Sequence, residues 1–142
     1  MTPKDAKNIG IHQTLKFITI AWLLFELVWL LQETKGDFGN GLLFYLDNHM
    51  HIEIAIIYCS IFGVIFFCGR QAGYDIIISG KKSFNTVVKY TTLSFAAIFL
   101  VLFIMFRLEG ADIEQILPLM MVLFLIFLIV WILSIQQIKK RA

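Results

Sequence analysis

Four long apolar stretches constrain this sequence more than any other feature. They cover about residues 15–31, 49–69, 87–106 and 113–135. A helix that crosses the roughly 30 Å hydrocarbon core of a bilayer needs about 20 mostly apolar residues, and each stretch comes close to that length. A closed barrel can also span a membrane, but the period-two alternation of barrel strands does not run through these stretches. The sequence therefore predicts four transmembrane helices.

The composition excludes several other classes of protein. Hydrophobic residues make up 59% of the 142 residues, whereas soluble globular domains contain about 45–50%. A water-soluble domain of this size cannot bury so much apolar surface. The composition also excludes a disordered chain and a nucleic-acid-binding module, and two cysteines cannot form a disulfide scaffold. We expect a single all-α membrane domain over residues 1–142, an antiparallel bundle of four transmembrane helices.

The positions of lysine and arginine predict how the chain is oriented. Cytoplasmic segments of membrane proteins carry an excess of these residues. If both termini are cytoplasmic, only Lys35 and Arg107 of the twelve lie outside. The chain then has an external loop at 32–48 and a cytoplasmic loop at 70–86. We expect an integral protein of a bacterial cytoplasmic membrane with both termini inside.

Local signals refine this outline at two places. Thr2 to Asp5 has the residues of a helix start with proline at the first position, so we expect a short interfacial helix that ends before Gly10. Within the external loop, Leu42 to Leu46 are apolar but too few to span, and we expect them to lie at the membrane surface.

Small residues predict which helix faces touch. Four of them on the second and third helices allow close approach: Ser60, Gly63, Ser94 and Ala97. We expect these two faces to be in contact. Gly69 and Gly73 have a similar spacing, but they lie at the inner boundary of the second helix, where the signal is weaker.

Glu26 is the one ionisable residue well inside a predicted span. A charge near the bilayer centre costs about 2.5–3.5 kcal/mol even on mild insertion scales, so Glu26 should face the bundle, a water-filled cavity or a partner. Trp22 and Trp29 share its helix face, and two tryptophans beside a carboxyl can form an aromatic-walled site for a cation. The alternatives are a structural hydrogen bond from Glu26 or contact with another subunit, with the tryptophans in the aromatic belt and in helix packing.

A second group of polar residues is expected at the external end of the bundle. His49 and Glu53 are four apart and share a helix face, whereas His51 points elsewhere unless the helix start is frayed. These are zinc or copper ligands by type, but they lack a recognised ligand spacing, so we favour a polar helix end over a metal site. Arg107 ends the third helix on this side and either extends to the headgroups or forms an ion pair with Glu26 or Glu53.

The sequence leaves three functions open. We favour a non-enzymatic accessory or structural subunit of a membrane assembly, because the chain is small and carries no catalytic motif. The alternative is a small oligomeric secondary transporter or channel that uses Glu26 as its proton- or cation-coupling carboxyl. A metalloenzyme built on His49, His51 and Glu53 ranks last.

One likeness bears on the transporter alternative. With four short helices and Glu26 in the first, the chain resembles the small multidrug transporters, although no further motif of that family occurs and the loops here are longer. No cofactor and no nucleic acid are expected. The expected partners are the lipid bilayer and either further copies of the chain or another membrane subunit.

Overall fold

The computed structural model describes residues 1–110 and 112–142. These residues form five helices and no strand: α1 (Pro3–Glu33), α2 (Phe38–His49), α3 (Ile52–Ile77), α4 (Ser83–Leu108) and α5 (Ile113–Lys140). All except α2 are long and apolar enough to cross a membrane. The predictions of an all-α fold and of four candidate spans are confirmed.

The helices extend beyond the apolar stretches. α1 begins at Pro3 with a capping box, in which the Thr2 hydroxyl accepts from the Asp5 N–H and the Asp5 carboxylate accepts from the Thr2 N–H. The predicted interfacial helix is therefore the first part of α1, which continues without a break through Gly10. Likewise, α3 ends at Ile77 and α4 begins at Ser83, so a short turn replaces most of the predicted loop at 70–86. Hydropathy identifies only the apolar part of a helix. The backbone hydrogen bonds of the helix can continue through polar residues, so each helix extends beyond its apolar part.

The predicted loop at 32–48 contains an additional helix. α2 begins after Asp37, whose side chain accepts a hydrogen bond from the Asn40 N–H at 3.2 Å. It ends at His49, and α3 then begins at Ile52, so the second candidate span starts later than the sequence predicted. The apolar patch of Leu42 to Leu46 belongs to this helix.

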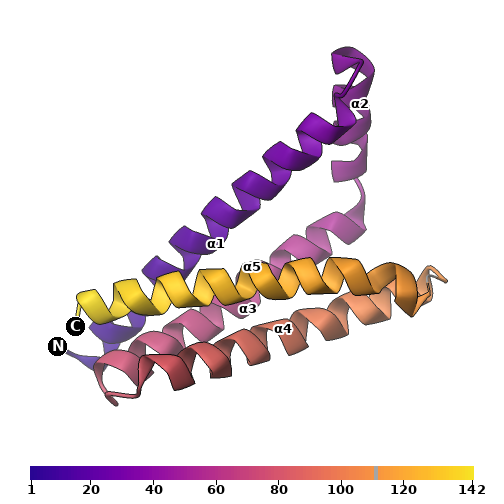
Figure 1. Ribbon diagram of the computed structural model, residues 1–142. Helices are drawn as coiled ribbons and strands as arrows, with labels where there is room; N and C mark the ends of the chain where they lie inside the picture. Colours follow the sequence, from indigo (N-terminus) through magenta and orange to yellow (C-terminus); the bar gives the residue numbers. More distant parts are fainter. Residues whose placement is uncertain (111) are drawn as a thin grey trace.

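The bundle has two different ends. Both termini and the turn between α3 and α4 lie together at one end, which we call the terminal end (Figure 1). The opposite end, here the far end, holds α2, the end of α4 and the start of α5 (Figure 1). From the terminal end, α1 and α2 diverge from α4 and α5, so the helices are packed together at one end and separated at the other (Figure 1).

Glycines bring α1 and α3 together near the terminal end. A Cβ added to Gly10 would lie 2.1 Å from the Gly69 carbonyl oxygen and 2.7 Å from the Gly73 nitrogen. The helix backbones therefore touch at residues whose spacing was a weak signal in the sequence. The predicted close packing of Gly63 is wrong, because an added Cβ there meets nothing within 4 Å. Ser94 instead accepts a hydrogen bond from Trp131 of α5 at 3.0 Å.

Candidate functional site

Glu26 lies at the centre of a polar cluster built from three helices. Its side chain is on α1 and the residue is only 9% exposed. Tyr58 of α3 donates to Oε1, and Tyr45 of α2 donates to Oε2. Nε2 of His49, at the end of α2, is 2.6 Å from Oε2. Both carboxylate oxygens are thus bonded within the chain, and Glu26 joins α1 to α2 and α3.

The orientation of the His49 ring is set from both sides. Its Nδ1 is 2.7 Å from the Tyr45 carbonyl oxygen, and because a carbonyl oxygen can only accept, Nδ1 carries a hydrogen. Nε2 then faces the carboxylate of Glu26. His49 and Glu26 therefore form a side-chain pair of fixed orientation in a partly buried place.

Aromatic rings surround this pair. The centroid of the Trp29 ring is 4.5 Å from that of His49, and the centroid of Tyr45 is 4.3 Å away. Trp29 Nε1 donates to Glu33 at 3.3 Å, which holds the indole in place. An aromatic-walled site for a cation beside Glu26 was one of the alternatives that the sequence left open. In the structure the imidazole of His49 lies beside Glu26, between the rings of Trp29 and Tyr45.

We call Glu26, Trp29, Tyr45, His49 and Tyr58 the Glu26 cluster. Tyr45 and Tyr58 were missed in the sequence, because Tyr45 falls in a segment predicted as a loop and Tyr58 has no unusual neighbours on α3. Trp22, which was expected beside Glu26, instead packs edge-on against Tyr58 and Phe62, with ring centroids 5.9 Å apart in both pairs.

The other predicted external residues stay outside this cluster. His51 is exposed at the N-cap position of α3, where its side chain makes no capping hydrogen bond, and Glu53 lies in the first turn of α3. His49 and Glu53 do not share a helix face, because the helix breaks between α2 and α3. Within residues 1–110 and 112–142, no group of three His, Cys, Asp or Glu side chains is placed to hold a metal ion.

Arg107 is exposed near the end of α4. The predicted ion pair of Arg107 with Glu26 or Glu53 is wrong, since it is not among the salt bridges of the described part of the chain. Glu26 faces α2 and α3, and its oxygens are already bonded to tyrosine and histidine side chains. The far end of α4 has also diverged from α1 (Figure 1).

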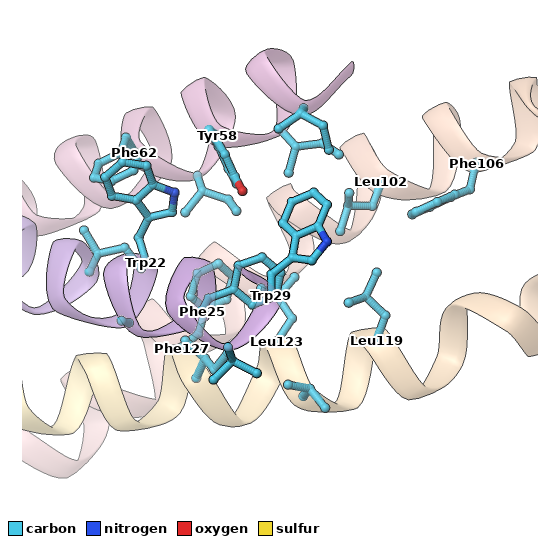
Figure 2. A pocket seen from close by; sticks show the side chains of 18 of the residues that line it. Trp22, Phe25, Trp29, Tyr58, Phe62, Leu102, Phe106, Leu119, Leu123 and Phe127 are labelled. Carbon is cyan, nitrogen blue, oxygen red and sulfur yellow. The ribbon is translucent and has the colours of Figure 1, made fainter. Parts of the chain in front are cut away.

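A cavity of about 380 Å³ lies next to the Glu26 cluster, between α1, α3, α4 and α5. Figure 2 shows aromatic and aliphatic side chains from all four helices around it. The residues labelled there include Trp22, Phe25, Trp29, Tyr58, Phe62, Leu102, Phe106, Leu119, Leu123 and Phe127. Tyr58 and Trp29 belong both to the cavity wall and to the Glu26 cluster. Among the residues that the structure describes, Tyr58 is the only titratable one in the wall.

Asp75 forms a second buried carboxylate cluster near the terminal end. It is 2% exposed and accepts a hydrogen bond from Tyr90 of α4 at 2.5 Å. Nζ of Lys81 and Nζ of Lys89 lie 3.4 and 3.5 Å from its two oxygens. Asp75 therefore joins the end of α3 to the following turn and to α4. The sequence placed this residue in a cytoplasmic loop and gave no sign of its burial.

Tyr45 makes the Glu26 cluster sensitive to alkaline pH. Burial, then the hydrogen bond to Glu26 and the charge of that carboxylate, raise the pKa of Tyr45 to about 12. The phenol of a tyrosine in the unfolded chain ionises near pH 10. Neutral Tyr45 therefore stabilises the folded state fully below pH 10, and this contribution is lost as the pH rises to about 12. We expect the melting temperature in detergent to fall between these pH values, and to fall less in Tyr45→Phe. An equal decline in both proteins would contradict this role of Tyr45.

The Glu26 cluster is chemically a closed network. Both oxygens of Glu26 and both ring nitrogens of His49 have partners within the chain. Such a network can hold helices together and can exchange a proton, but it has no free ligand atom directed into the cavity. No known family, curated protein or solved structure matches this chain.

Proposed function

We propose that this chain is a non-enzymatic integral membrane protein that acts as an accessory or structural subunit of a membrane assembly. The observation that carries the proposal is the bonding of Glu26. A carboxylate that holds helices together has its oxygens bonded to other helices of the same chain, and both oxygens of Glu26 are bonded to side chains of α2 and α3. Burial of an acid in an apolar span is tolerated when its polar atoms are satisfied in this way. Glu26 then serves to hold the outer part of the chain together.

The proposed orientation places both termini in the cytoplasm of a bacterial cell. The terminal end of the bundle collects most of the basic side chains, as the positive-inside rule requires: Lys4, Lys7, Lys81, Lys82, Lys139, Lys140 and Arg141. Alkaline phosphatase folds only outside the cytoplasm. Fused at the C-terminus it should be inactive, and inserted at Gly36 it should be active. The reverse pattern would contradict this orientation.

The subunit proposal predicts a stable complex with another membrane protein. Each candidate span keeps most of its apolar surface outside the chain's own core, which suits contacts with further helices in a bilayer. Native mass spectrometry after gentle extraction from the source membranes should show a different chain in fixed stoichiometry. Deleting that partner should lower the abundance of this protein. Extraction only as single chains or as homo-oligomers would contradict the accessory role.

The second candidate function is a small oligomeric secondary transporter, and one observation favours it. Tyr58 links the two parts of the site, since its hydroxyl bonds Glu26 while its ring lines the cavity. A change of protonation at Glu26 and His49 can therefore alter the position of the Tyr58 ring in the cavity wall. Proteoliposomes with a pH gradient test this function, with Glu26→Gln as the inactive variant and Glu53→Gln as its control. The accessory role predicts that neither the wild type nor Glu26→Gln nor Glu53→Gln carries a proton flux across the vesicle membrane.

A further inference from the structure

The cavity beside the Glu26 cluster has a mouth between two candidate spans. Phe25 and Val28 of α1 line the cavity, yet they are 43% and 54% exposed. Across from them, Leu119 and Val122 of α5 also line it and are 42% and 54% exposed. These four residues therefore form the rim of the mouth. Since these four rim residues are apolar and belong to candidate spans, their part of the mouth faces hydrocarbon once the helices are in a bilayer.

The inner wall of the cavity is apolar and aromatic. Trp22, Phe62 and Phe127 contribute large rings, and Phe127 is fully buried (Figure 2). A cavity with such a wall does not hold water but takes up apolar molecules. Its volume of about 380 Å³ falls within the roughly 300–1,000 Å³ of small-molecule sites. Gln32, the lining residue nearest the end of α1, gives the cavity one polar end.

We propose that this cavity binds one hydrocarbon chain of a membrane phospholipid, which enters between α1 and α5. The headgroup lies beyond Gln32, where α1 ends in the polar residues Glu33 and Thr34. An acyl chain offers only apolar groups to the apolar part of the wall, and the polar end of the cavity at Gln32 suits the headgroup to which the chain is attached. This inference rests on the proposed membrane insertion and is independent of the subunit role.

Native mass spectrometry of the full chain tests the proposal directly. The protein in detergent is titrated with palmitoyl-oleoyl phosphatidylcholine, and we expect one lipid to be retained in a saturable manner. Ala21 lines the cavity, so the ring of Ala21→Phe should occupy the site and weaken binding by about tenfold or more. Ile20→Phe is the matched control, because Ile20 is 46% exposed and is not part of the wall. Equal binding by both variants would overturn the proposal.

A second pair of variants covers the case in which Ala21→Phe does not fold. Leu123→Phe adds volume from the α5 side of the cavity, and Leu125→Phe adds the same volume on the lipid-facing side, where Leu125 is 56% exposed. Only Leu123→Phe should lose the bound lipid. If Leu123→Phe or Ala21→Phe changes the proportion of dimers and leaves the lipid count unchanged, a second copy of the chain fills the cavity and the lipid proposal is wrong.

Tryptophan fluorescence in vesicles gives an independent measurement. Trp22 and Trp29 line the cavity, whereas Trp131 is fully buried and bonded to Ser94. Phosphatidylcholine brominated on its acyl chains should quench the first two at low mole fraction, with saturation in the wild type. In Ala21→Phe the quenching should instead follow the bulk fraction of brominated lipid. Wild-type quenching that follows the bulk fraction would overturn the lipid site, whereas protein that fails to float with the vesicles would contradict membrane insertion itself.

Discussion

Replacing Gly73 with alanine is expected to lower the free energy of unfolding by about 1–3 kcal/mol, the usual effect of overpacking a tight contact. The added Cβ would lie 2.2 Å from the Ala6 carbonyl oxygen and 2.9 Å from the Gly10 Cα. Both are backbone atoms of α1, which cannot rotate away as a side chain can. The crossing of α1 and α3 must therefore open, and the effect should be larger still for valine.

Gly63→Ala is the matched control, because Gly63 lies on the same helix and an added Cβ there meets nothing within 4 Å. Alanine is favoured over glycine in a helix by about 1 kcal/mol, so Gly63→Ala should be as stable as the wild type or more stable. Unfolding of both variants is followed by circular dichroism in mixed micelles at increasing SDS fraction. Equal stability of Gly73→Ala and Gly63→Ala would show that α1 and α3 do not touch at Gly73.

Glu26→Gln is expected to destabilise the α1–α2–α3 part of the chain by about 1–3 kcal/mol, the cost of leaving a buried hydrogen-bonding group without its partner. The amide keeps the size of the side chain but replaces one acceptor oxygen with a donor. Either Tyr58 or Tyr45 then loses its acceptor. Because α2 is held to α1 through these bonds, its backbone amides should exchange hydrogen faster while those near the terminal end keep their protection.

Two further variants separate the charge of Glu26 from other effects. Glu53→Gln removes a carboxylate in the first turn of α3 outside the Glu26 cluster, and such a surface change should stay within about 0.5 kcal/mol of the wild type. Tyr58→Phe keeps the ring in the cavity wall and removes one hydrogen bond, so its effect should lie between the other two. Unchanged exchange of the α2 amides in Glu26→Gln would contradict the role of Glu26 in holding α2.

Sequence reasoning was most successful where the hydropathy of a continuous stretch decides the outcome. The apolar stretches identified the four candidate spans, because no other secondary structure of that length satisfies its backbone in an apolar setting. Sequence reasoning was less successful at predicting where the helices end. Ser83 and Lys140 lie outside the predicted spans but inside helices, since helical hydrogen bonds do not require apolar side chains.

The candidate site was predicted only in part, because only some of its residues are marked by a local property of the sequence. Glu26 is conspicuous because an acid is costly in an apolar span, and Trp29 shares its helix face. Tyr45 and His49 reach it only because residues 38–49 form a helix that turns back against α1, and the angle of that turn is not encoded in a hydropathy pattern. The expectation that His49 and Glu53 share a helix face assumed one continuous helix, and the break between α2 and α3 separates them.

By itself, the sequence determined the all-α class, the four candidate spans and the presence of one acid that needs partners, because each of these follows from the free energy of placing local groups in an apolar environment. The tertiary structure alone decided which atoms satisfy Glu26, that α1 and α3 touch at Gly10 and Gly73, and that the separated far end encloses an apolar cavity. These depend on the crossing of distant helices, which is set by the combined packing of many side chains and not by any local stretch of the chain.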